Sequence, residues 1–441
     1  MRNRRRNTEL SLLLFGAVVV VSAYVLASLG RLAEIPADIV PFFGIILGLL
    51  AAAHLATRRF APRADAMLLP VASLLNGIGY VFIARLDDEL ARLQAIWTLV
   101  GVGAFIATLV LVRSTRVLEQ YRYTLMLVGV ALLVLPLAPA IGQEINGARI
   151  WVSVGPVNFQ PGEFAKLAFA VFFAGYLVDK REVLAASNRR FLGMAIPEAR
   201  HLGPIVVAWG ASLLVMVGEK DLGSSLLFFA LFVVLLWVAT ERPSYLVMSL
   251  VMFAAGAAFS YNRFAHVQER VEVWLDPFED PFGNGFQVTQ SAFALADGGL
   301  TGTGLGTGSP NTENIPAVET DFIFAIIGEE LGLFGAAGIL IAFMLMIGTG
   351  LRIAIRADRP FDKLLATGLT TLLGFQAFII IAGVIRVLPL TGVTLPFISY
   401  GGSSLLANWI LLALLLRISD ESTRRRLRAG QASGATLQRS A

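Results

Sequence analysis

Long and nearly uninterrupted runs of apolar residues alternate with shorter polar segments along most of the chain. A helix that crosses the roughly 30 Å hydrocarbon core of a bilayer needs about 20 such residues. The runs lack the period-2 alternation of membrane β-barrel strands, so they predict helices. We count about twelve, near residues 10–30, 38–56, 66–84, 93–112, 124–142, 161–178, 203–218, 222–240, 243–261, 321–351, 364–385 and 400–417. The pattern therefore predicts an all-α polytopic membrane protein with about twelve transmembrane helices.

The positions of the basic residues support this count. If the N-terminus is cytoplasmic and the spans alternate, 26 of the 35 Lys and Arg residues fall in cytoplasmic segments. Eight fall in external segments: Arg31, Arg85, Arg92, Arg149, Lys220, Arg263, Arg270 and Arg386. Short cytoplasmic loops of membrane proteins are enriched in Lys and Arg. We therefore expect both termini in the cytoplasm. The apolar run after MRNRRR is longer than a usual signal-peptide core, so we expect an uncleaved first span.

Composition narrows the class of protein. The 441 residues are 56% hydrophobic and 15% charged, whereas soluble domains are about 25% charged. Such a composition excludes disordered chains and ordinary cytosolic enzymes. The chain has no cysteine, which excludes disulfides, thiolate metal sites and cysteine nucleophiles, and its three histidines are far apart. A net charge of +4 could suggest a nucleic-acid partner, but the basic residues are concentrated in the segments next to the membrane. We therefore expect no nucleic-acid partner.

Two external loops carry most of the remaining polar residues. The longer, 262–320, contains WLDPFEDPFGNG with Asp276, Glu279 and Asp280. A carboxylate at a membrane mouth can act as a general base or help to bind a divalent cation. The alternative, which these residues alone favour, is that Asp-Pro is turn chemistry. In the same loop, residues 285–300 have the pattern of an amphipathic helix at the outer interface.

The shorter external loop, 143–160, contains Arg149 beside Trp151, a pair that suits an interfacial anchor. In the long loop, the glycine-rich segment 298–308 does not match a phosphate-binding loop, and we expect a flexible connector. Prolines and glycines at 389–402 break the helix before Ser403 and Ser404. A broken segment at membrane depth must be buried in protein or line a cavity.

Charges inside the predicted spans form a further group. Glu163 and Lys166 are three residues apart, so they share a helix face and can pair. Glu329 and Glu330 lie in the tenth span, with Asp321 near its outer end. Charges at this depth are costly and usually functional. They either pair to hold helices together or line a polar cavity, and the two interpretations are compatible.

Six segments in order resemble the SEDS family (shape, elongation, division and sporulation), typified by RodA, FtsW and SpoVE. They are NGARIW at 146–151, QPGEFAKL at 160–167, DLGSS at 221–225, DPFEDPFGNGFQVTQS at 276–291, TDFIFAIIGEELG at 320–332 and LPFISYGGSSLLANW at 395–409. The resemblance covers roughly residues 120–420. Two local departures are Gly162, where the family commonly has Ser, and Glu219-Lys220, where it has Gln-Pro.

The resemblance implies a peptidoglycan glycosyltransferase that polymerises lipid II into glycan strands and releases undecaprenyl pyrophosphate. Asp280 matches the family's essential aspartate, which we expect to deprotonate the incoming sugar hydroxyl or to help hold a metal. Glu163 and Lys166 match the family's intramembrane pair beside a central cavity, and Arg149 is expected to face the pyrophosphate or lipid headgroups. We expect the remaining cavity or substrate-binding residues to be Trp151, Asp321, Glu329, Ser403 and Ser404.

The family usually has ten spans, so residues 1–120 are expected to include two extra helices. Residues 121–418 would form the core with the loop 262–320, and 419–441 a disordered cytoplasmic tail. The resemblance also implies a class B penicillin-binding protein as partner and a place in the bacterial cytoplasmic membrane. Short termini favour the elongation type. Mg²⁺ or Mn²⁺ is compatible with a pyrophosphate leaving group, and no organic cofactor is expected.

Two other functions remain open from the residues. A lipid II flippase would use the same intramembrane charges through alternating access. A scaffold for a penicillin-binding protein would need none of them. The external Asp280 favours the transferase, because a transporter would depend mainly on the charges inside the spans.

Overall fold

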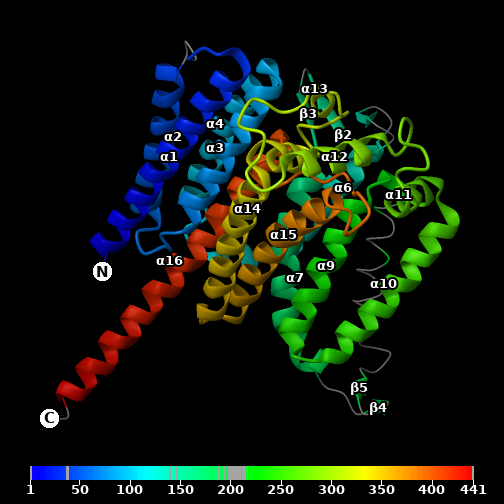
Figure 1. Cartoon of the computed structure of the whole chain (residues 1–441). Helices are drawn as coiled ribbons and strands as arrows, with labels where there is room; N and C mark the ends of the chain where they lie inside the picture. The colour runs from blue at the N-terminus through cyan, green and yellow to red at the C-terminus, as the bar shows by residue number, and fades with distance from the viewer. Residues whose placement is uncertain are drawn as a thin grey trace.

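The computed structural model describes residues 2–35, 39–138, 141–145, 148–155, 157–185, 189–191, 194–196, 210, 215 and 217–439. They form a bundle of long helices with small β-sheets at its ends (Figure 1). The start of α1 and the end of α16 lie at one end of the bundle, and β2, β3, α12 and α13 lie at the opposite end. This arrangement agrees with two termini on one side of a membrane and the Asp280 loop on the other.

The first four helices are α1 (Arg2–Leu32), α2 (Ile39–Phe60), α3 (Leu68–Leu86) and α4 (Asp88–Leu111). The turn between α3 and α4 is tight because one residue serves both helices: the Asp87 backbone N–H donates to the Ile83 carbonyl oxygen at the end of α3 (2.9 Å), and its side chain caps α4. Asp87 follows α3 and caps α4, accepting hydrogen bonds from the backbone N–H groups of Glu89 (2.7 Å) and Leu90 (2.9 Å). α1 packs on α3, and α2 packs on α4.

A short helical and β segment follows. It comprises α5 (Thr115–Gln120), α6 (Arg122–Val134), η1 (Leu135–Leu137), β1 (Gly142–Ile145), β2 (Ala148–Val154) and β3 (Val157–Phe159). The strands form an antiparallel sheet in the order β1-β2-β3. α7 (Gly162–Ala185) comes next, and the hairpin β4 (Arg189–Phe191) and β5 (Met194–Ile196) lies at the end of the bundle where α1 begins. These two small sheets depart from the predicted all-α fold.

α9 (Leu222–Thr240) and α10 (Pro243–Arg263) lead into the long loop. That loop is largely ordered: it contains α11 (Ala265–Leu275), α12 (Phe286–Gly298) and α13 (Pro310–Glu313). α12 confirms the helix expected at 285–300, although it also packs on α14 rather than only facing the membrane interface.

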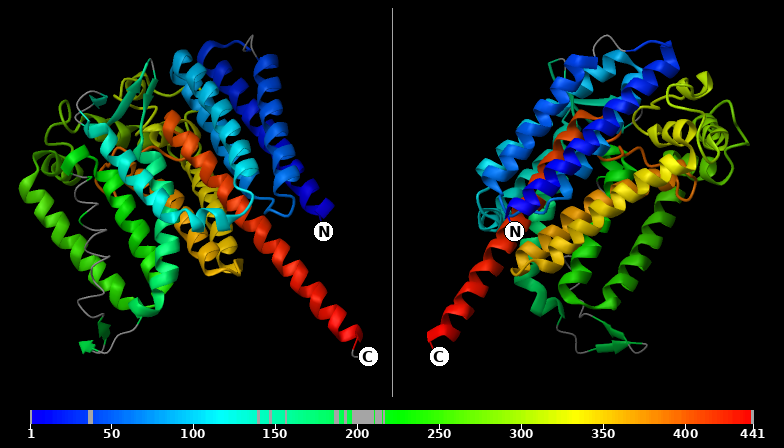
Figure 2. Two further views of the ribbon diagram at one scale, coloured as in Figure 1. Left: turned by 180° about the vertical axis from the view of Figure 1, so that it is seen from behind. Right: turned by 60° about the vertical axis from the view of Figure 1, so that its left-hand side comes forward.

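The last three helices are α14 (Ile323–Arg356), α15 (Pro360–Val384) and α16 (Gly402–Arg439). α15 contacts α7, α9, α14 and α16, and its side chains are mostly buried, so it forms the centre of the bundle. Where the sequence predicted a disordered tail, α16 continues as a helix that extends beyond the bundle (Figure 2).

Nine helices within the described residues are long and apolar enough to cross a membrane: α1 to α4, α9, α10 and α14 to α16. The segment Arg122–Leu137 is a shorter apolar helix, and α7 coincides with the span expected at 161–178. The span expected at 203–218 falls almost entirely outside the described residues. The protein is therefore a polytopic helical membrane protein, and the count of twelve stays a prediction.

Candidate active site

The loop between α11 and α12 presents Asp280 at the surface. The Asp280 carboxylate accepts hydrogen bonds from the backbone N–H groups of Gly283 (3.0 Å) and Asn284 (3.1 Å). A Cβ at Gly283 would lie about 2.1 Å from an Asp280 oxygen, so a side chain at this position would displace the carboxylate. The turn therefore holds the carboxylate in one position while leaving it exposed to solvent.

The same loop is fastened to the chain segment that follows α15. Trp274 Nε1 donates to the carbonyl oxygen of Arg386 (3.1 Å), and Arg386 Nη2 donates to the carbonyl oxygens of Trp274 and Leu275 (both 3.2 Å). The Arg386 guanidinium also lies 6.0 Å from the centre of the Phe278 ring. Exposed apolar side chains surround this anchor, including Leu275, Phe278 and Phe282. They suit contact with the membrane interface.

An apolar pocket of about 230 Å³ lies between α9, α10, α11 and residues 388–391. Leu388, the first lining residue of this segment, is two residues after Arg386. The chain segment that anchors the loop therefore also lines the pocket. Arg270 of α11 supplies a cation to the lining and donates from Nη1 to the carbonyl oxygen of Leu390 (3.0 Å). A pocket of this kind can receive hydrocarbon while its cation faces an anionic group.

Asp321 lies close to Arg270, and a second carboxylate, Asp221, lies close to Asp321. Asp321 lies two residues before the first residue of α14, and Asp221 caps α9 by accepting from the Ser224 N–H (3.0 Å). Burial raises the pKa of Asp321 to about 6, although its hydrogen bond with Thr320 and the charge of Arg270 oppose this effect. Asp321 thus lies near Arg270 of the pocket lining, and its role as a cavity residue stays a prediction.

A buried polar network crosses the centre of the bundle. Lys166 Nζ lies 2.8 Å from Glu163 Oε1 and 3.1 Å from the Gln376 side-chain oxygen, and all three residues are nearly inaccessible to solvent. The Gln376 amide nitrogen donates to the carbonyl oxygen of Thr394 (2.9 Å). The predicted Glu163–Lys166 contact is therefore present, and α15 provides a third member.

Both predicted serines border this network. Ser404 Oγ accepts from the Thr394 hydroxyl (2.8 Å) and lies 3.4 Å from the Gln376 amide. Ser403 Oγ accepts from the Gln160 N–H just before α7 (2.9 Å). The segment 389–402, expected to line a cavity or be buried, thus lies between the Arg386 anchor and the buried network. No hydrogen bond or ion pair among the described residues joins Asp280 directly to Glu163 or Lys166.

Glu329 and Glu330 are buried and serve a different contact. Glu330 pairs with Arg85 of α3, which also lies 3.1 Å from Glu313. The backbone N–H groups of Gly306 and Ser309 donate to Glu330 (2.8 Å) and Glu329 (2.6 Å). The glycine-rich segment 298–308, which the sequence predicted to be a flexible connector, is hydrogen-bonded to α14. These charges join helices, which agrees with the pairing interpretation.

Arg149 and Trp151 lie on β2, and both are partly exposed. Trp151 pairs with Gln143 of β1 in the antiparallel register. The ion pair between Lys220 and Glu144 (3.2 Å) connects this sheet to the segment before α9. The structure thus places both residues at the end of the bundle that carries the Asp280 loop (Figure 1), without a hydrogen bond or ion pair between the described residues to link them to Asp280.

Three residues of the site were not singled out from the sequence: Arg270, Gln376 and Arg386. The sequence identified the two arginines only as external charges. A single glutamine in an apolar run is a weak signal of a functional site. Within the described residues, no three His, Asp or Glu side chains gather as metal ligands. Mg²⁺ is commonly bound by one or two carboxylates together with substrate phosphates, so the expected Mg²⁺ or Mn²⁺ stays a prediction, and we assign no step to a metal.

Comparisons with known proteins identify the family of this chain. The family model described as "Cell cycle protein", which covers FtsW, RodA and SpoVE, matches residues 67–424. The peptidoglycan glycosyltransferase RodA of Mycobacterium tuberculosis is 47% identical over 95% of this chain and 92% of its own length. The probable peptidoglycan glycosyltransferase FtsW of Geobacter sulfurreducens is 33% identical over 81% of this chain and 95% of its own.

Solved structures give the same result. A chain of a peptidoglycan synthase complex aligns with a TM-score of 0.67 and 26% identity over 81% of this chain and 98% of its own. The rod shape determining protein RodA of Thermus thermophilus aligns with a TM-score of 0.57 and 25% identity over 81% of this chain and 96% of its own. The predicted resemblance is confirmed: the chain belongs to the FtsW/RodA/SpoVE family of cell cycle proteins.

Proposed function

We propose that this chain is a peptidoglycan glycosyltransferase of the RodA type, which polymerises lipid II into glycan strands for cell elongation. The support from sequence is the 47% identity to RodA of M. tuberculosis across nearly the whole chain, against 33% to an FtsW across a smaller share. The same relationship supports a place in the bacterial cytoplasmic membrane, with both termini in the cytoplasm and the Asp280 loop outside.

One observation carries the proposal. The exposed Asp280 carboxylate belongs to a loop anchored at Arg386, next to an apolar pocket between α9, α10 and α11. A lipid-linked sugar needs such a combination, because its polyprenyl tail must stay in hydrocarbon while its sugar meets a polar catalytic group. Arg270 at the pocket lining would face the diphosphate, since an arginine fork suits phosphate oxygens.

In the proposed reaction, Asp280 accepts the proton of the acceptor sugar hydroxyl as that oxygen attacks the anomeric carbon of the donor. The new glycosidic bond forms while the bond from the anomeric carbon to the diphosphate oxygen breaks. Undecaprenyl pyrophosphate leaves with the electron pair. General base catalysis of this kind contributes roughly 10²- to 10⁴-fold to a rate. Arg149 and Trp151 would contact lipid or diphosphate at the outer interface.

A class B penicillin-binding protein is the proposed partner, and the aligned chain of a peptidoglycan synthase complex supports it. The test uses the purified full-length chain with that partner and fluorescent lipid II, with strands separated on a gel. A transferase yields strands that lysozyme digests. A flippase instead moves lipid II across vesicles without forming strands. Absence of polymer together with transbilayer movement would contradict the proposal.

Topology can be tested in the same protein, because the chain contains no cysteine. Phe282 is 90% exposed beside Asp280 and suits a Phe282→Cys probe, whereas a cysteine at Gly283 would collide with the Asp280 carboxylate. A membrane-impermeant maleimide should label the probe in intact cells. Labelling only after the cells are opened would contradict the proposed orientation.

A further inference from the structure

A second apolar pocket lies among the four N-terminal helices, on the other side of the bundle from α9 to α11 (Figure 1). α1 and α2 line it together with α3, α4 and Trp409 of α16. Its volume is about 210 Å³, larger than an apolar cavity of about 150 Å³ that holds one benzene molecule. α1 and α2 precede the residues matched by the family model, so the proposed reaction does not explain this pocket.

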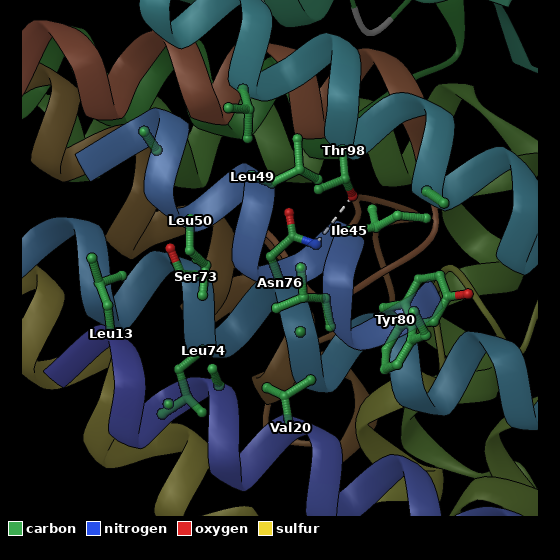
Figure 3. A pocket seen from close by; sticks show the side chains of 18 of the residues that line it. Leu13, Val20, Ile45, Leu49, Leu50, Ser73, Leu74, Asn76, Tyr80 and Thr98 are labelled. Carbon is green, nitrogen blue, oxygen red and sulfur yellow. Dashed lines mark hydrogen bonds between the residues drawn. The ribbon is translucent and has the colours of Figure 1, made fainter. Parts of the chain in front are cut away.

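The walls of the pocket select hydrocarbon. Figure 3 shows leucine, isoleucine and valine side chains from α1 to α3 pointing into it. The Ser73 hydroxyl lines the pocket without a hydrogen-bond partner among the described residues. The other main polar groups satisfy one another: the Asn76 amide donates to Thr98 Oγ1 (3.2 Å), and Trp409 Nε1 donates to Asn76 Oδ1 (3.2 Å). A polar ligand would have to break these bonds, whereas a methylene chain would not.

The shape of the pocket fits one lipid chain. Along α2 the lining runs from Pro41 to Ala53, a rise of about 18 Å at about 1.5 Å per residue. One leaflet is about half of the roughly 30 Å hydrocarbon core. Ile45, on the pocket edge, is 60% exposed, so the pocket is open toward the surrounding bilayer. An acyl chain can therefore enter sideways.

A basic hollow of about 380 Å³ adjoins the outer end of this pocket and shares Tyr80 with it. Tyr24, Phe42 and Tyr80 contact one another at the junction, with ring centres 4.2 to 6.4 Å apart. Aromatic residues of this kind mark the membrane interface. The hollow contains the exposed Arg31 and Arg92, together with Arg85, which pairs with Glu330.

We propose that these two hollows bind one anionic phospholipid from the leaflet on the Asp280 side. One acyl chain lies in the pocket, and the phosphate lies over Arg31 and Arg92. Glu330 neutralises Arg85, so the charges left in the hollow are Arg31 and Arg92 against the single carboxylate of Asp88, and their net positive charge complements a phosphate. The bound chain fills the space between the α1–α3 and α2–α4 pairs and holds them together. This lipid is distinct from the lipid-linked sugar, whose proposed groove lies at α9 to α11.

The test is native mass spectrometry of the full-length protein in mild detergent, titrated with phosphatidylglycerol and, separately, with undecaprenyl phosphate. Gly16→Leu fills the pocket: Gly16 lines it, and a Cβ there meets only the Cβ of Leu74 at 3.8 Å. Gly48→Leu is the matched control on α2, because no atom lies within 4 Å of a Cβ there. Arg31→Gln combined with Arg92→Gln removes the proposed phosphate contacts.

Wild type and the Gly48 variant should each retain one phosphatidylglycerol, with occupancy at least fivefold lower in the Gly16 variant. The double arginine variant should lose at least threefold, whereas Arg263→Gln, at the end of α10, should lose nothing. Equal occupancy in all variants would overturn the proposal, as would retention of undecaprenyl phosphate in preference to phosphatidylglycerol. If the Gly16 variant fails to fold, the two arginine experiments decide by themselves.

Discussion

The buried pair Glu163 and Lys166 allows a quantitative prediction about stability. Lys166 Nζ has two close partners, the Glu163 carboxylate at 2.8 Å and the Gln376 amide oxygen at 3.1 Å. Both charged residues are at most 5% exposed. Breaking a buried ion pair by removing one partner costs about 3–5 kcal/mol, because it leaves an uncompensated buried charge. Glu163→Leu and Lys166→Met should therefore each destabilise the protein by about that amount.

The double variant should behave differently. Replacing a buried pair with apolar residues of similar volume is often neutral. Here it leaves Gln376 without one of its partners, which costs about 1–3 kcal/mol. The double variant should thus be more stable than either single variant, and the coupling energy should be about 3 kcal/mol or more.

The assay is a double-mutant cycle on equilibrium unfolding in mixed detergent micelles, followed by circular dichroism. Ser404→Ala in each background shows whether the rest of the network is intact. Single variants whose penalties simply add, with a coupling energy below about 0.5 kcal/mol, would refute the reasoning. That outcome would mean that the pair is already separated or hydrated in the folded protein.

Three further predictions concern the loop, the glycine-rich segment and pH. Arg386→Gln removes the hydrogen bonds to the carbonyls of Trp274 and Leu275. The kcat for polymerisation should therefore fall about tenfold or more, with a smaller change in KM, and amide hydrogen exchange at residues 276–285 should become faster. Unchanged kinetics would contradict the anchoring of the loop by Arg386. Gly302→Ala should lower the free energy of unfolding by more than about 1 kcal/mol, because φ at Gly302 is +84° and a Cβ would lie 2.1 Å from the Glu330 carbonyl oxygen. Equal thermal stability of this variant and wild type would contradict the close packing of Gly302 against Glu330. Burial raises the pKa of Asp321 from 3.8 in the unfolded state to about 6 in the folded state, so the folded state binds more protons between these two values. The free energy of unfolding should therefore fall by about 2–3 kcal/mol as the pH rises from about 4 to above 6. Asp321→Asn should flatten this part of the profile of unfolding free energy against pH.

Much of the bundle could be predicted because membrane helices have a strong local signal. Apolar runs of about 20 residues identified the nine long helices, and the i, i+3 spacing identified the Glu163–Lys166 contact. The pattern at 285–300 likewise predicted α12. Each of these features depends on residues that are close in sequence, so neighbouring residues suffice to find it.

The remaining features depend on contacts between distant segments. Arg85 was counted among the external charges, yet it is buried because α14 brings Glu330 beside it. Gln376 joins the buried network only because α15 packs on α7, and Trp274 meets Arg386 across 112 residues. The three short strands at 142–159 lie in a loop whose alternation is too brief to stand out. Tertiary packing decides these features, and no local pattern encodes it.

The central claim is that Asp280 acts as the base for glycan polymerisation, and one comparison tests it most directly. Asp280→Asn keeps one acceptor oxygen for the turn at Gly283 and Asn284 but cannot take a proton, whereas Asp280→Ala loses both functions. Asp297→Ala, on the exposed face of α12, is the control. With the partner and fluorescent lipid II, both Asp280 variants should polymerise at least about 100-fold more slowly than wild type, while the control keeps its rate. Full-rate strands from Asp280→Asn would contradict the account.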